Sequence, residues 1–181
     1  NSMYSSSPSV FLNNLIPSFG HAPSDYHYTT MDGSNIQFIP IGRVSARNGN
    51  TVRHYLNKLK EYNAEYNATA AADQNPTKKE YMKWLIHLGG GSGVSQQTDY
   101  RSNLKSFEDK IKDTLHGAKV FSVFKNGPDI SEDVTSVDLT TRINTGVSLI
   151  TFFGHSSASI FDVGIGEPST FTNKGKYPIF L

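Results

Sequence analysis

The chain of 181 residues contains no cysteine. It can therefore form no disulfide, and none of its own residues can act as a thiol nucleophile. The absence says nothing about the cellular compartment, because many secreted bacterial proteins also lack disulfides.

Long apolar runs and an excess of charge are missing as well. No run reaches the roughly 18 apolar residues of a membrane span, and the N-terminal residues lack the basic start and apolar core of a secretory signal. The 17 basic and 16 acidic residues leave a formal net charge of +1. Because no broad field is available to attract phosphates or anionic lipids, we expect no nucleic-acid partner and no membrane span in this chain.

The residues that are present have a globular composition. Hydrophobic residues make up 36% of the chain, aromatic residues 12% and charged residues 18%, so rings are plentiful and charges slightly few. A chain of this length can bury most of its apolar surface in one medium-sized domain or in two small lobes.

Turn formers dominate the first part of the chain. Residues 1–34 are rich in Ser, Pro, Asn and Tyr and are expected to be mostly loop. The run NIQFIPIGR over 35–43 predicts a strand, and apolar residues at spacings of three and four predict a helix over 51–65. The small and polar stretch 68–76 is the expected linker between two lobes.

Strands and helices are expected to alternate after this linker. The predicted strands cover 81–88, 119–124, 147–153 and 177–181, with one predicted helix whose apolar stripe runs from Tyr100 to Leu115 and another over 136–143. Such alternation predicts a mostly parallel sheet with helices on both faces. Ligands bind these sheets outside the carboxyl ends of the strands, which here are 89–93, Lys125 and 154–155.

His155 stands where the apolar strand GVSLITFF gives way to a polar run of serines. At the carboxyl end of a strand, a histidine can reach a bound substrate and act as a general base. The alternative is a partly exposed histidine that only caps the edge of the sheet.

The glycine-rich and serine-rich turns carry weaker signals. The turn LGGGSGV follows a strand, yet no Lys-Ser or Lys-Thr pair and no GxGxxG spacing accompanies it, so a flexible wall of the crevice is favoured over a phosphate site. The serines at 156, 157 and 159 lack the second glycine of a nucleophile elbow.

Acidic residues and the other histidines add two further possibilities. Asp162 and Glu167 could orient His155 or bind a cation, although acids among glycines are more often solvated loop residues. A zinc site built from His21, the acid at 25 and His27 matches no tetrahedral spacing. No metal ligand is therefore assigned.

Several segments, taken in order, resemble the gingipain-type cysteine peptidases of the caspase and haemoglobinase clan. GVSLITFFGHSSASIFD followed by KYPIFL resembles their catalytic segment, and PSFGHAPSDYHYT, IPIGRVSARNGNTVRHYLNKLKEYN and KWLIHLGGG are similar to earlier segments. The resemblance implies an α/β fold with three α/β/α layers and a mostly parallel sheet. It also implies that residues 1–75 are the C-terminal part of a first lobe and that 76–181 are the N-terminal part of a truncated catalytic lobe.

In that family, a histidine after one central strand is paired with a cysteine after the next. The resemblance implies that His155 is the catalytic histidine and that the cysteine lies a few residues beyond Leu181, so the chain alone is expected to be inactive. Adjacent parallel strands, about 4.8 Å apart, would present both side chains at one edge of the sheet. An imidazole there can activate the thiol and later protonate the leaving amine.

The resemblance also implies roles for neighbouring residues. The backbone N–H of Ser156, next to Gly154, is expected to hold the oxyanion, although better-known members have His-Gly where this chain has His-Ser. Some members orient the histidine with an acid behind the glycine-rich turn, and Asp99 is the acid closest behind it here. Gly90 and Gly91, in the wall of the crevice, are the expected substrate-binding residues.

These expectations describe a fragment of an exported bacterial cysteine endopeptidase, or of a sortase-like transpeptidase of type IX secretion, secreted or held at the cell surface. Its partners would be a protein or peptide substrate and the rest of the parent protein. No cofactor is expected, and calcium, which is common in such peptidases, cannot be assigned to particular residues. The alternatives are a non-catalytic peptidase-like domain that binds a partner in the export machinery, and an unrelated α/β domain.

Overall fold

The computed structural model describes residues 24–31, 34, 36–44, 46, 48–71, 76–129, 131–134, 137–156 and 160–181. The chain divides into two compact units, residues 1–53 and 54–181. The predicted boundary between lobes near residue 75 falls at 72–75, outside the described residues, and stays a prediction.

The first unit holds the 3-10 helix η2 (Tyr26–Thr29). The guanidinium of Arg43 donates two hydrogen bonds to the carboxylate of Asp25, at 2.7 and 2.6 Å. Asp25 belonged to the zinc site considered from the sequence, and its carboxylate is instead paired with an arginine. His21, another residue of that set, lies outside the described residues.

The predicted strand at 35–43 is wrong for the residues that the structure describes there. The extended pairing consists of one isolated antiparallel bridge between Thr30 and Gln37. Pro40 interrupts the run, and a proline has no N–H to donate to a neighbouring strand. The apolar and β-branched composition of the segment therefore does not produce a paired strand.

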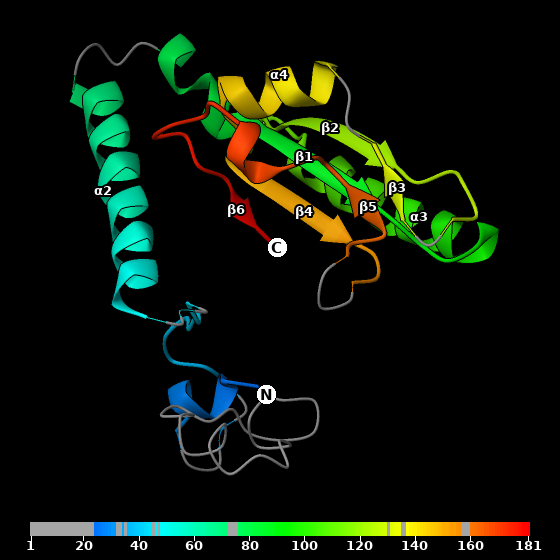
Figure 1. The fold of residues 1–181 in the computed structure, drawn as a ribbon, viewed down its shortest axis with the longest axis horizontal. Helices are drawn as coiled ribbons and strands as arrows, with labels where there is room; N and C mark the ends of the chain where they lie inside the picture. Colours follow the sequence, from blue (N-terminus) through cyan, green and yellow to red (C-terminus); the bar gives the residue numbers. More distant parts are fainter. Residues whose placement is uncertain are drawn as a thin grey trace. The chain divides into compact units, whose positions relative to one another are not determined.

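Helix and strand segments alternate through the rest of the chain (Figure 1). The elements are α2 (Gly49–Ala71), η3 (Pro76–Lys83), β1 (Trp84–Gly89), α3 (Val94–Ile111), β2 (Lys119–Phe124), β3 (Glu132–Asp133), α4 (Val137–Thr145), β4 (Leu149–Phe153), β5 (Val163–Gly164), η4 (Pro168–Thr170) and β6 (Ile179–Phe180). Most predicted elements are thus present. The predicted strand at 81–88 begins later, because its first residues belong to the 3-10 helix η3.

Within the described residues, four strands form one parallel sheet in the order β2-β1-β4-β6. Leu85 of β1 lies opposite Val120 of β2 on one side and Leu149 of β4 on the other. Ile150 of β4 lies opposite Phe180 of β6. The predicted α/β class and mostly parallel sheet are confirmed, as is the pairing of the last two predicted strands. Two-residue strands β3 and β5 form a second parallel pair, which the sequence patterns did not predict.

Helices α3 and α4 lie on opposite faces of the main sheet, which makes three layers (Figure 1). Ile86 and Leu88 of β1 point to the face covered by α4, where they pack in the apolar core. The other buried members of that core are Leu139, Ile143, Val147, Ile150 and Val163. The neighbours of Ile86 and Leu88 along the strand point to the opposite face, which α3 covers.

The two buried residues of α3 are one apolar and one charged side chain. Leu104 is fully buried, and Glu108, one turn later, is 7% exposed. The predicted apolar stripe is wrong at Phe107, which is 50% exposed, and at Leu115, which is 82% exposed, whereas Ile111 is half-buried. The helix ends at Ile111, so Leu115 falls outside it.

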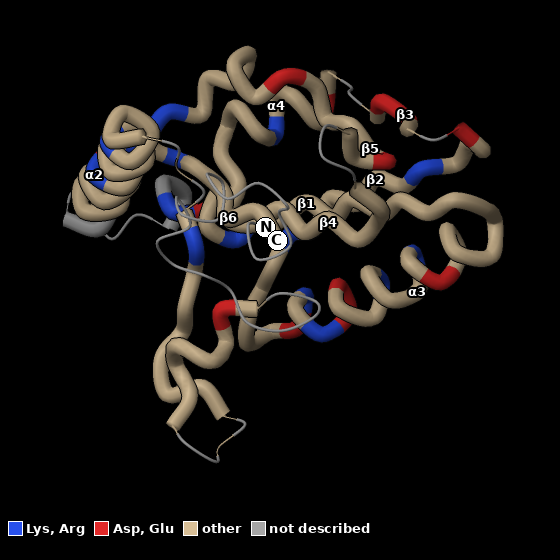
Figure 2. The backbone as a smooth tube through the Cα atoms, turned by 60° about the horizontal axis from the view of Figure 1, so that its bottom comes forward, with Lys and Arg blue, Asp and Glu red and all other residues tan. Residues whose placement is uncertain are grey.

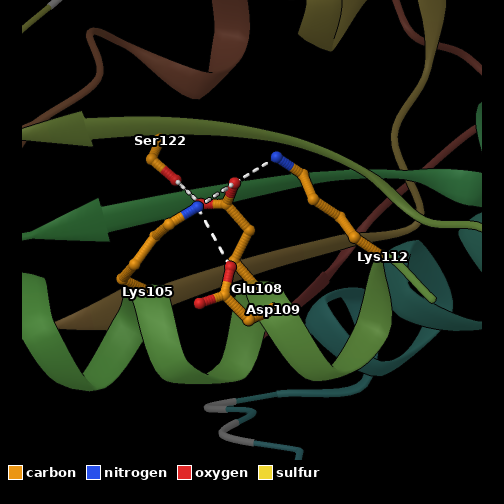
Figure 3. Close-up of polar contacts among 5 residues, drawn as sticks. All are labelled: Lys105, Glu108, Asp109, Lys112 and Ser122. Carbon is orange, nitrogen blue, oxygen red and sulfur yellow. Dashed lines mark hydrogen bonds and ion pairs between the residues drawn. The ribbon is translucent and has the colours of Figure 1, made fainter.

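Lysines on both sides along α3 neutralise the buried carboxylate of Glu108 (Figure 3). Its Oε1 accepts hydrogen bonds from Lys112 and, at 3.2 Å, from Lys105, while its Oε2 accepts one from Ser122 of β2 at 3.3 Å. Burial opposes the ionisation of Glu108, but the hydrogen bonds from Lys112 and Lys105 outweigh it and lower the pKa. The helix is thereby joined to the sheet by a polar contact.

Charged residues of both signs are interspersed along α3 (Figure 2). This distribution agrees with the net charge of +1, which leaves no strong field of one sign. No helix in the described part of the chain combines the length and the apolar character that crossing a membrane requires.

Shortening a core side chain should cost far more stability than shortening an exposed one on the same helix. Leu139 of α4 is fully buried, whereas Val137 is 87% exposed. We expect Leu139→Ala to lower the free energy of unfolding by about 2–5 kcal/mol, because it leaves a cavity. Val137→Ala should change it by less than about 0.5 kcal/mol. Urea denaturation followed by circular dichroism measures both, and similar losses would contradict the assignment of the core.

The buried histidine of β1 should make stability depend on pH. His87 is 2% exposed, and burial lowers its pKa below the ordinary value of 6.5, although the Glu108 carboxylate and the Leu104 carbonyl oppose this effect. The unfolded chain therefore binds this proton at a higher pH than the folded chain does. The free energy of unfolding should fall as the pH drops below about 6.5, with no contribution from His87 above it.

The measurement is the slope of unfolding free energy against pH in urea titrations. His87→Leu should make this slope smaller below about pH 6.5, because the variant has no proton to bind at this position. His54→Gln, a change at an exposed histidine of α2, should leave the slope as it is in the unaltered chain. Equal slopes for all three proteins would show that His87 does not contribute.

Candidate functional site

The carboxyl ends of three neighbouring strands lie at one level of the sheet. The amide of Gly90 donates to the carbonyl of Phe153 at 2.9 Å, and the amide of Lys125 donates to the carbonyl of Gly89 at 2.8 Å. The turns that follow β1, β2 and β4 therefore begin side by side. This confirms the prediction that the glycine-rich turn, Lys125 and the segment 154–155 meet at one edge of the sheet.

His155 is exposed at this edge, two residues after the end of β4. Its Nε2 lies 2.8 Å from Oε1 of Gln96 and 3.5 Å from the hydroxyl of Tyr100. Gln96 and Tyr100 are four residues apart on α3 and so share a face of the helix. The ring of Tyr100 also stacks on Phe153, with 4.3 Å between centroids. The start of α3 thus supplies the neighbours of the imidazole.

The backbone around Ser156 pairs with the backbone around Phe161. Ser156 and Phe161 form an antiparallel bridge, and the amide of Asp162 donates to the carbonyl of His155 at 2.9 Å. In antiparallel pairing the residue next to such a bond belongs to a non-hydrogen-bonded pair. The amide of Ser156 is consequently directed away from Phe161, as an oxyanion donor would need to be. Residues 157–159 lie outside the described residues.

Asp162 follows Phe161 in this pairing, and its side chain is buried. The residue is 5% exposed, and its Oδ2 accepts a hydrogen bond from the amide of Gly91 at 2.8 Å. Its Oδ1 is buried and has no hydrogen-bond partner among the described residues. The carboxylate therefore connects the turn after β1 with the segment that carries His155.

Glycines directly after β1 and β4 leave the space that this carboxylate occupies. A Cβ atom on Gly90 would lie 2.1 Å from Oδ1 of Asp162, and one on Gly154 would lie 2.3 Å from the same oxygen. Gly91 has a φ of 122°, a conformation that residues with a side chain rarely adopt. The glycine-rich turn is thus required by the close approach of Asp162. Gly90 and Gly91 as substrate-binding residues remain a prediction.

Asp99, the acid proposed to orient the histidine, lies on the exposed surface of α3. The contacts of the imidazole within the described residues run to Gln96 and Tyr100 instead. The assigned role of Asp99 stays a prediction, as do the roles of Ser156 and Gly154.

Three residues of this site were missed or given little weight in the sequence. The sequence gives no signal for Gln96, because the resemblance implies an acid at the start of α3, and the apolar spacing places Tyr100 in a stripe. Asp162 was interpreted as a solvated loop residue. A signal was present, since glycines at the ends of two neighbouring strands indicate a bulky group between them.

Two charged residues beside this edge, Lys125 and Glu132, form hydrogen bonds with backbone groups of the protein. Lys125 is 1% exposed and donates to the carbonyl of Asp129. The amides of Gly127, at 2.8 Å, and Asn126, at 3.0 Å, donate to Oε2 of Glu132 and lower the pKa of that carboxyl. In the part of the chain that the structure describes, no cluster of three or more His, Asp or Glu residues is arranged to hold a metal ion.

The chemistry open to this edge follows from these contacts. An exposed imidazole is held by an uncharged side chain, and the amide beside it is directed away from Phe161. An imidazole can accept or donate a proton, and a neighbouring amide can stabilise a developing negative charge. A nucleophile with an activating base next to it would complete a site for acyl transfer.

Filling the space at Gly90 should disturb this edge, whereas filling it at Gly93 should not. Gly90→Ala would place a methyl group against Asp162, and we expect a loss of about 1–3 kcal/mol in the free energy of unfolding. Gly93 precedes α3 with an extended φ of −166° and open space around it. Gly93→Ser therefore adds a larger side chain in the same turn, and its effect should stay within about 0.5 kcal/mol. Equal thermal stabilities would contradict the close packing of Asp162.

Comparison with known proteins now bears on this arrangement. The profile of peptidase family C25 matches residues 2–181, which is nearly the whole chain. Searches of curated proteins and of solved structures return no significant match. The gingipain-type resemblance is confirmed at the level of the family, and with it a protein or peptide as the class of substrate. The chain belongs to peptidase family C25, the gingipain family of cysteine peptidases.

Proposed function

We propose that His155 is the general base of a cysteine peptidase whose nucleophilic thiol lies outside residues 1–181. Membership of a cysteine-peptidase family calls for a thiol, and the chain has none of its own. The proposal therefore assigns the chain the histidine half of a catalytic pair, together with the strand next to which the thiol would stand.

The observation that carries this proposal is the parallel pairing of β4 with β6. Leu149 lies opposite Ile179 and Ile150 lies opposite Phe180, an offset of 30 residues. The same offset would bring position 185 level with His155 if the pairing continued. Neighbouring strands lie about 4.8 Å apart, so a cysteine at or beside that position would be within reach of the imidazole and of one substrate.

The reaction would proceed by acyl transfer. The imidazole takes the proton of the thiol, the thiolate attacks the scissile carbonyl carbon, and the carbonyl oxygen becomes an oxyanion. The amide of Ser156, which is directed away from Phe161, is the proposed donor to this oxyanion. The imidazolium then gives its proton to the leaving amine as the C–N bond breaks, and water or a second amine releases the acyl group.

The biological setting is proposed from the family resemblance alone. We place the parent protein among exported bacterial peptidases, secreted or held at the cell surface. Hydrolysis by water would make it an endopeptidase, whereas release by an amine would make it a sortase-like transpeptidase of type IX secretion. Both reactions would use the same histidine.

A non-catalytic role is the second candidate. One departure from the family pattern favours it, because Ser156 follows the histidine where better-known members have glycine. In that case the exposed edge around His155 would bind a partner of the export machinery without cleaving it. The residue at or beside position 185 separates the two, since the peptidase needs a cysteine there.

The proposal is tested on the parent protein, produced far enough past Leu181 to include the next cysteine. A thiol-reactive peptide analogue should label that cysteine, and His155→Ala should slow labelling by about 10²-fold or more, because the general base is lost. The control is His116→Ala, which removes an exposed histidine paired with Asp113. Labelling is followed by mass spectrometry of the intact protein over time.

Three outcomes would count against the peptidase. They are a parent sequence without a cysteine near position 185, labelling that is as fast in His155→Ala as in the unaltered protein, and an equal loss of labelling in His116→Ala. The first of these would favour the binding domain.

A further inference from the structure

One oxygen atom at the start of α3 accepts two hydrogen bonds. Oε1 of Gln96 lies 2.7 Å from the backbone nitrogen of Ser92 and 2.8 Å from Nε2 of His155. A backbone N–H can only donate, so the side-chain atom that faces Ser92 must be the amide oxygen. The orientation of the Gln96 amide is therefore determined by the main chain of the glycine-rich turn.

The same atom determines which nitrogen of the imidazole holds the proton. An amide oxygen accepts and never donates, so Nε2 of His155 must carry a hydrogen to bond with it. A neutral imidazole has one N–H, which leaves the lone pair on Nδ1. We propose that Gln96 is a positioning residue that holds His155 in the Nε2–H tautomer and leaves Nδ1 as its basic nitrogen.

The other neighbours of the ring do not compete with this contact. The hydroxyl of Tyr100 is 3.5 Å from Nε2, beyond the usual length of a hydrogen bond, whereas Gln96 is at 2.8 Å. Tyr100 stacks on Phe153 and meets the imidazole at a tilt of 52°, so it borders the ring as an aromatic wall. The Asp162 amide bonds to the carbonyl of His155 and leaves the ring itself to Gln96.

A glutamine differs from an acid in this position. A carboxylate would attract the imidazolium by its charge, whereas a neutral amide can only orient the ring by a hydrogen bond. The family resemblance pointed to an acid behind the glycine-rich turn, and in this chain the residue in contact is an amide. The tautomer is a property of the chain as it stands; the use of Nδ1 as the base toward a thiol rests on the proposed function.

The tautomer can be measured on the 181-residue chain by nuclear magnetic resonance with ¹⁵N-labelled histidine. Long-range ¹H–¹⁵N correlations, recorded where the ring is neutral, report the ratio of the Nε2–H and Nδ1–H forms of His155. Gln96→Met keeps the length of the side chain and removes the acceptor, and should lower this ratio by about 3- to 10-fold. Gln96→Glu keeps an acceptor oxygen and should retain the ratio.

A matched control uses an exposed residue of the same helix. Asn103→Met places the same side chain two turns away from Gln96 and should leave the ratio unchanged. The proposal is overturned if His155 in the unaltered chain holds its proton on Nδ1. It is also overturned if Gln96→Met has the same ratio as the unaltered chain, or if Asn103→Met lowers the ratio equally.

The catalytic part is tested on the extended protein with its cysteine. Gln96→Met should slow labelling by the thiol-reactive peptide about 10-fold, and Gln96→Glu should restore most of the rate. If labelling proves independent of His155, the proposed function fails while the tautomer measurement still decides the role of Gln96. If labelling needs His155 but is equal in all Gln96 variants, the positioning role in catalysis is overturned and the proposed function stands.

Discussion

The geometry of this edge of the sheet depends on one buried carboxylate. Asp162 lies between Gly90 and Gly154, at distances that leave no room for a Cβ atom on either, and bonds to the amide of Gly91. Its own amide holds the carbonyl of His155. The turn after β1 and the exit of β4 are therefore held in one arrangement, and the histidine is presented from a backbone that is fixed on both sides. A buried carboxylate with one hydrogen bond from the described residues is costly, so its presence indicates a structural requirement.

The two faces of the sheet contribute differently to this arrangement. The face toward α4 is apolar and supplies most of the core, with Leu139 and Ile143 fully or almost fully buried. The face toward α3 is partly polar, because Glu108 joins the helix to β2 through Ser122 and two lysines. These contacts set the position of α3 on the sheet. The first turns of the same helix then reach the imidazole through Gln96.

Much of the fold could be predicted from the sequence, because it depends on local patterns. Alternating apolar residues and turn glycines marked β2 and β4, and the histidine at a strand exit located the edge of interest. The contacts of that edge could not be predicted, since they join residues far apart in the chain: Gln96 with His155, and Asp162 with Gly90. The stripe ending at Leu115 failed because the helix stops earlier and a charged residue takes the buried position. The spacing of apolar residues does not reveal that two lysines neutralise the buried carboxylate of Glu108.

The amide that contacts the imidazole carries no net charge, and this affects how the edge responds to its surroundings. Dissolved ions screen the attraction between two charged side chains at a surface, and they screen it more as their concentration rises. The bond from Nε2 to Gln96 is short, direct and made to a neutral group while the ring is neutral. The orientation of the His155 ring is therefore largely independent of ionic strength, at low and at high salt concentration.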